Sequence, residues 1–191
     1  LVLTVLFVFC GVKRRSDLYE RLESVQQKYC FLLVMREFDL VRGDDIPDDT
    51  SYEELLETVD AKTYDAGLVT PPCNTHRRAR NAWRSSPGPR PMRSKRFPKG
   101  FPWLRDKRLA ECNLANEMVS RAWVIVRRLK AAGSLSLVEH PEDLGVTADG
   151  ETPASIWQDP EAREVQSLTD ACSFAFFQCD RAQRLRSLPA C

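Results

Sequence analysis

The sequence lacks the cysteine patterns of a disulfide framework or a zinc site. Its seven cysteines are odd in number and scattered, and no two of them form a Cys-x-x-Cys pair. The two histidines, His76 and His140, show no ligand spacing with any cysteine. We therefore expect no metal site, and reduced thiols suit an intracellular protein better than an exported one.

The sequence also has no apolar run long enough to cross a membrane. The opening LVLTVLFVFC is short and has no basic segment ahead of it, so it indicates a buried strand rather than a signal peptide. No internal repeat is present. The chain begins with Leu1 rather than Met, which leaves open that it is a fragment of a longer protein.

Composition and charge indicate one globular domain with an uneven surface. The 191 residues are 43% hydrophobic and 29% charged, as in soluble single-domain proteins. The net charge of +1 hides ten acids between Glu37 and Asp60, and twelve bases between Arg77 and Arg108 with Asp106 as the one acid. The basic window indicates either an anionic partner or a solvated loop.

Apolar runs and cap residues predict an α/β fold. We expect strands at 1–9, 29–39, 64–70, 134–140 and 173–179, and helices at 16–28, 52–60, 104–132 and 161–169. Ser16 and Thr50 or Ser51 are expected N-caps, and Gly133 a helix stop. Because helices separate the strands, the sheet is expected to be mostly parallel, with helices on both faces. The stretch at about 77–103, rich in Pro, Gly, Ser and Arg, predicts a long surface loop.

Chemically useful side chains follow the predicted strands. In an open parallel sheet, ligands bind beyond the carboxyl ends of the strands. The residues there are Phe9, Gly11, Glu37, Asp39, Pro71, Pro72, Cys73, Glu139 and His140. An acid after the second strand suits ribose hydroxyls, Gly11 allows close approach of a ligand, and His140 is expected to line a pocket. Solvated strand-end acids are the alternative reading.

Four segments in this order, FCGVKRRSDL, EFD, DAGLVTPPCNT and LVEHPED, resemble the S-adenosylmethionine-dependent DNA cytosine-5 methyltransferases. The resemblance is greatest to the short methylase-like proteins of mobile elements, through PPCNTHRRAR, GPRPMRS, GFPWL and EHPED. It covers nearly the whole chain and implies a single Rossmann-like methyltransferase domain over residues 1–191. The implied cofactor is S-adenosylmethionine and the implied partner is DNA, with RNA left open and the nucleus as a candidate location.

The resemblance also implies roles for individual residues. Phe9, Gly11 and Pro71 would line the cofactor site, and Asp39 or Glu37 would hold its ribose. Cys73 would be the nucleophile, and Glu139 would grip the target base. The residues expected to contact phosphates are Arg77, Arg78, Arg80, Arg90, Arg93, Lys95 and Arg96. The first three of these would also favour the Cys73 thiolate, and Trp83, Phe97, Phe101 and Trp103 would pack against bases or against the protein.

Two alternatives to an active cytosine methyltransferase follow from departures in the sequence. The relatives run into a glycine and KPT near their end, where this chain has DRAQRLRSLPAC, so we expect a truncated or degenerate C-terminal end. A catalytically degenerate, element-derived nucleic-acid-binding protein is therefore the first alternative. An amino-methyltransferase is disfavoured, because Thr70 and Cys73 flank the prolines where an acid or Asn and an aromatic residue are expected.

Overall fold

The computed structural model describes residues 1–12, 18–39, 43–77, 80, 89–148, 150–169 and 171–173. These residues form an α/β fold, as predicted. The elements, in chain order, are β1 (Val2–Val8), α1 (Leu18–Tyr29), β2 (Leu32–Phe38), α2 (Asp49–Asp60), β3 (Ala66–Val69), α3 (Asp106–Ala132), β4 (Leu135–Val138), the short 3-10 helix η3 (Ile156–Gln158) and α4 (Pro160–Thr169).

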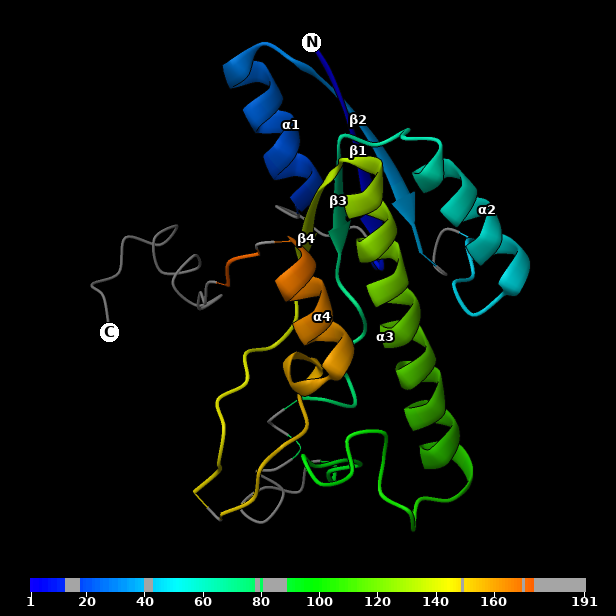
Figure 1. Cartoon of the computed structure of the whole chain (residues 1–191), viewed down its shortest axis with the longest axis vertical. Helices are drawn as coiled ribbons and strands as arrows, with labels where there is room; N and C mark the ends of the chain where they lie inside the picture. The colour runs from blue at the N-terminus through cyan, green and yellow to red at the C-terminus, as the bar shows by residue number, and fades with distance from the viewer. Residues whose placement is uncertain are drawn as a thin grey trace.

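Within the described residues, four strands form one parallel sheet in the order β2-β1-β3-β4. The chain moves outward from β1 to β2 and then crosses back to β3 on the other side of β1, which is Rossmann-like. The order therefore reverses between β1 and β3, where open α/β sheets place their ligand crevice. Figure 1 shows the carboxyl ends of the strands directed toward the end of the molecule that holds the loop before α3.

Helices cover both faces of the sheet, because successive crossovers in opposite directions place their helices on opposite sides. On one face, Leu6, Val8 and Val69 pack in the main core with α2 and α3. Trp123 and Leu129 of α3 belong to this core, and an ideal Cβ on Gly67 would lie 2.2 Å from Cδ1 of Leu129. Helix α1 packs on the other face, beside β2 (Figure 1).

The helix ends confirm one predicted signal and correct another. Gly133 ends α3 in the left-handed conformation, with φ of 87°, as its freedom from a Cβ predicts. Helix α2 begins earlier than predicted, because Asp48, and not Thr50 or Ser51, is its N-cap: the Asp48 carboxylate accepts from the Ser51 amide at 2.8 Å. The predicted cap at Ser16 lies outside the described residues.

The described part of the segment before α3, residues 89–105, is irregular, as predicted, but it is not only a surface loop. Met92 and Leu104 form a small second core with Cys112 of α3, and Phe101 packs against it. The predicted strand at 173–179 lies outside the described residues except for Ser173, and so does the tail that follows it. Across the part of the chain that is described, none of the helices has the length and apolarity needed to cross a membrane.

Candidate functional site

A strained turn follows β1 at the point where the strand order reverses. Phe9 has φ of 63° and Gly11 has φ of 69°, so two left-handed residues stand close together. The Phe9 amide donates to the Phe38 carbonyl at 2.9 Å, and the Thr70 hydroxyl donates to the Phe9 carbonyl at 2.9 Å. A non-glycine residue in this conformation is held only where its surroundings fix it, and such residues concentrate at functional sites.

The acid at the end of β2 lies against this turn. One carboxylate oxygen of Asp39 accepts from the Gly11 amide at 2.9 Å. Glu37 lies within β2, in register with Phe7, so Asp39 is the acid that stands beyond the strand end. A Cβ on Gly11 would meet nothing within 4 Å, so the turn faces open space. A carboxylate beside an open glycine backbone fits the hydroxyl groups of a nucleoside ligand.

The predicted nucleophile follows β3. After Pro71 and Pro72 the chain turns at Cys73, whose carbonyl accepts from the His76 amide at 3.0 Å. The partly exposed Cys73 thiol accepts a hydrogen bond from Nε of Arg77 at 3.4 Å. This bond to Cys73 raises the pKa of the Arg77 guanidinium. A neighbouring guanidinium favours the thiolate, which is the reactive form of cysteine.

The predicted base-gripping acid stands at the neighbouring strand end. Glu139 follows β4 directly, and its amide donates to the Val69 carbonyl at the end of β3 at 3.0 Å. Its side chain is partly buried. The sheet therefore brings the segments of Phe9, Asp39, Cys73 and Glu139 to one edge, as the sequence predicts.

The predicted phosphate-contacting residues differ in how far their side chains are exposed. Arg90, Lys95 and Arg96 are exposed. The Arg80 side chain is only 15% exposed, because it pairs with Glu111 at 3.1 Å and donates to the Asn74 carbonyl at 2.6 Å. Arg78 and Trp83 lie outside the described residues.

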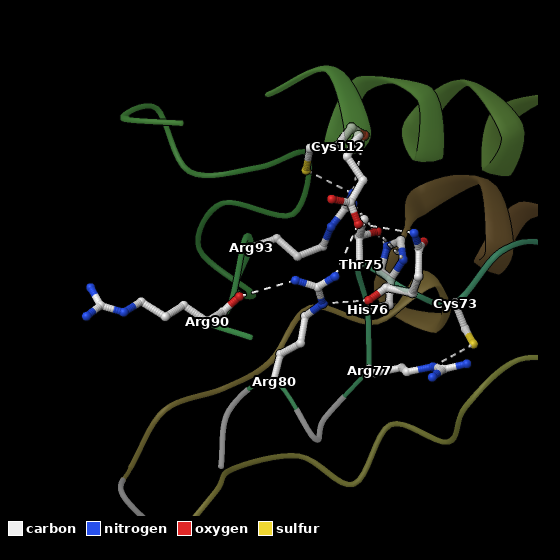
Figure 2. Close-up of polar contacts among 10 residues, drawn as sticks. Cys73, Thr75, His76, Arg77, Arg80, Arg90, Arg93 and Cys112 are labelled. Carbon is white, nitrogen blue, oxygen red and sulfur yellow. Dashed lines mark hydrogen bonds and ion pairs between the residues drawn. The ribbon is translucent and has the colours of Figure 1, made fainter. Parts of the chain in front are cut away.

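Arg93 corrects the prediction of a phosphate contact. It is 3% exposed, and its guanidinium donates to Asn116 Oδ1 at 2.8 Å, to the Pro98 carbonyl at 2.8 Å and to Cys112 Sγ at 3.0 Å. Figure 2 shows this guanidinium enclosed between Cys112 and His76. Burial lowers the pKa of Arg93. The side chain ties the loop to α3 and cannot reach a ligand on the surface.

His76 is locked as a neutral imidazole by the same network. Because a guanidinium only donates, Nε2 of His76 must accept from Arg93 at 3.0 Å. The ring proton then lies on Nδ1, which donates to the Thr75 hydroxyl at 3.3 Å. Burial, followed by the charge of Arg93, lowers the pKa of His76 to about 2. Sequence reasoning missed this cluster, since its members are far apart in the chain.

His140 lines a small pocket beside His76, which confirms its predicted position. Its ring meets His76 edge-on at 5.2 Å between centroids and Trp157 at 6.3 Å. Burial lowers the pKa of His140 to about 4, against a smaller opposite effect of the Pro141 backbone. Neither ring nitrogen makes a hydrogen bond of normal geometry. The pocket has a cavity volume of about 20 Å³, enough for a bound water.

Trp157 and Trp123 extend this contact into the main core. Their rings meet edge-on at 6.1 Å, and the Trp157 indole donates to the Pro141 carbonyl at 3.0 Å.

Within the described ranges, no group of three or more His, Cys, Asp and Glu side chains is arranged to hold a metal ion.

The chain was also compared with known proteins. No protein-family model matches it, and neither a curated protein nor a solved structure matches it. The resemblance to cytosine-5 methyltransferases therefore stays a prediction.

Proposed function

We propose that this chain is a cytosine-5 methyltransferase-like domain that acts on DNA through Cys73. The observation that carries the proposal is the guanidinium of Arg77 on the Cys73 thiol, at 3.4 Å, beside the reversal point of a parallel sheet. A thiol is thereby placed at the edge where open parallel sheets bind their ligands.

The Cys73 thiolate would make carbon 5 of cytosine nucleophilic enough to accept a methyl group. Carbon 5 of cytosine is a poor nucleophile, so Cys73 adds to carbon 6, and the electron pair of the ring double bond makes carbon 5 reactive. After carbon 5 has gained a methyl group and lost its proton, the carbon–sulfur bond breaks and Cys73 leaves as the thiolate. Arg77 stabilises that thiolate before addition and after release.

Glu139 is the proposed partner of the base. Its segment hydrogen-bonds to the end of β3, immediately before the prolines that carry Cys73. A carboxyl group there balances the charge that develops on the ring nitrogen next to the amino group. The target base must leave the helix stack to reach this edge.

The turn after β1 and the acid after β2 form the proposed cofactor site. Gly11 provides an open backbone beside the left-handed Phe9, and Asp39 provides the carboxylate. Pro71, buried after β3, is the proposed neighbouring residue. S-adenosylmethionine bound there would supply an electrophilic methyl group.

A covalent-capture experiment tests the nucleophile, because a 5-fluorocytosine oligonucleotide cannot lose a proton from carbon 5 and traps the protein. With S-adenosylmethionine present, we expect the intact protein to gain the mass of the oligonucleotide and one methyl group. Cys73→Ser should abolish this adduct, whereas Cys172→Ser, which removes another exposed thiol, should retain it. An adduct that survives Cys73→Ser would overturn the assigned nucleophile.

Nucleic-acid binding without catalysis is the second candidate. The exposed Arg90, Lys95 and Arg96 favour it, because phosphate contacts by these residues do not need Cys73. The absence of both adduct and cofactor binding, together with DNA binding that weakens steeply with salt, would favour this candidate over the enzyme.

A further inference from the structure

We propose that Phe97, Phe101 and Trp103 form a stacking platform that binds an unpaired base of single-stranded nucleic acid. The proposal rests on the proposed function only in taking nucleic acid as the partner. It does not require methyl transfer.

The three rings form one compact cluster. Trp103 lies parallel to Phe101, with 4.6 Å between ring centroids and 8° between ring planes. Phe97 meets both rings edge-on, at 5.8 Å from Trp103 and 6.0 Å from Phe101. Trp103 is nevertheless 62% exposed, so stacking on Phe101 leaves much of the indole open to a ligand.

Phe101 and the turn before α3 anchor the platform to the rest of the protein. Phe101 packs against the small core of Met92, Leu104 and Cys112, and its amide donates to the Met92 carbonyl at 2.9 Å. The carbonyl of Lys99 accepts from the Asn116 side chain at 2.8 Å, which fixes the turn to α3. A rigid aromatic surface loses little conformational entropy on binding.

One cation lies against the cluster, and further exposed cations are close in sequence. The Arg96 guanidinium lies 5.4 Å from the centroid of the Phe97 ring. The other exposed cations close in sequence are Lys95, Lys99, Arg105, Lys107 and Arg108, with Asp106 as the one acid among them. Exposed aromatic faces beside cations are the features with which proteins bind single strands, because bases stack on the rings while cations contact the phosphates.

This chemistry favours a single strand over the alternatives. A duplex buries its base faces, so it offers cations a backbone but offers Trp103 nothing on which to stack. A second copy of this chain would bring the same positive charges together, which is unfavourable. Figure 1 shows the loop before α3, which carries the three rings, at the carboxyl end of the strands. The segment that carries Cys73 lies at the same end.

Binding of a labelled 12-nucleotide oligo(dC), followed by fluorescence anisotropy, tests the platform. The protein carries Cys73→Ser, so that neither covalent capture nor the proposed catalysis contributes. We expect the single strand to bind more tightly than its duplex. Trp103→Ala should weaken binding of the single strand on the order of ten-fold, because stacking of one base is worth about 1–3 kcal/mol. Trp103→Phe should retain most of the affinity.

Matched controls separate stacking from general surface effects. Leu114→Ala removes another exposed apolar side chain, 44% exposed on α3, and should leave the affinity unchanged. Arg96→Gln should reduce the slope of log affinity against log salt concentration by about 0.7, the value expected for one phosphate contact on a single strand. Lys130→Gln, in the last turn of α3, should leave this slope unchanged. Equal binding of oligo(rC) also supports the platform, since stacking uses faces that all bases share.

Three results would overturn the proposal. The first is that Trp103→Ala binds the single strand with an affinity within two-fold of that of the parent protein, while its far-UV circular dichroism spectrum is unchanged. Another is equal affinity for duplex and single strand. The third is a dimer, seen by sedimentation, that Trp103→Ala dissociates without any effect on nucleic-acid binding, because the rings would then form a contact between copies.

Discussion

Arg93 and Arg96 stand close together in a basic stretch and have different surroundings. Arg96 is exposed beside the Phe97 ring, whereas Arg93 is buried and donates to Asn116 and to Cys112. Nothing in the local sequence separates the two, because the acceptors of Arg93 come from the loop after β3 and from α3. Its burial was therefore outside the reach of sequence analysis.

We predict that Arg93→Lys destabilises the fold. A lysine ammonium lacks the planar fork that reaches His76, Asn116 and Cys112 together, so buried acceptors would lose their donor. The free energy of unfolding, measured by urea titration, should fall by about 3 kcal/mol.

Arg96→Lys, at an exposed position, is the matched control and should change the unfolding free energy by less than about 0.5 kcal/mol. Under conditions where Arg93→Lys is folded, its affinity for oligo(dC) should equal that of the wild type. A specific loss of affinity would contradict the burial of Arg93.

At the scale of elements, the sequence was enough to predict β1 to β4 and the functional side chains that follow them. Continuous apolar runs marked β1, β2 and β3, and parallel strands necessarily bring Cys73 and Glu139 to one edge. Two features were not predictable. The N-cap of α2 is Asp48, and the sequence does not single it out because several polar residues there are possible caps. The small core in the loop before α3 could not be predicted because Met92, Leu104 and Cys112 come together only in the folded chain.

The contact between β3 and α3 gives a prediction about packing. Gly67→Ala would place a methyl group 2.2 Å from Cδ1 of Leu129, a side chain that is fully buried. The leucine or the helix must move, so the unfolding free energy should fall by about 1–3 kcal/mol.

The double variant Gly67→Ala with Leu129→Ala tests the mechanism of that loss. Removing the leucine branches creates the space that the new methyl group needs, so the two changes should cost less together than the sum of their separate costs. Additive losses would show that the strain of Gly67→Ala arises elsewhere. Gly133→Ala is a comparison in which the new methyl group meets open space and the cost comes from the left-handed backbone. Its loss of unfolding free energy should add to that of Leu129→Ala only if the two positions act independently.

At the scale of the whole molecule, His76 and His140 join three segments: the loop after β3, the loop after β4 and the loop before α3. Both are buried and neutral, with pKa values lowered to about 2 and about 4. The unfolded chain binds protons near pH 6.5, so below this pH it holds protons that the folded chain does not. Stability is therefore complete above about pH 6.5 and decreases as the pH falls toward the folded values.

We predict that acidification from pH 7 to pH 5 lowers the unfolding free energy by on the order of 2 kcal/mol per histidine. Asp159 acts in the opposite direction, since burial raises its pKa. Comparison of wild type with His140→Phe in urea titrations at both pH values isolates the histidine. The variant should lose less stability on acidification, and an identical loss in both proteins would exclude His140 as a source.

The hydrogen bond from Thr70 to the Phe9 carbonyl joins the two halves of the proposed site mechanically. Phe9 belongs to the turn beside Asp39, and Thr70 is followed by two prolines whose fixed backbone leads to Cys73. A displacement of the turn by a bound ligand must either break this bond or move the prolines and the thiol with it. Occupancy of one half would then shift the position of the other, so binding at the two halves would be coupled, equally in both directions.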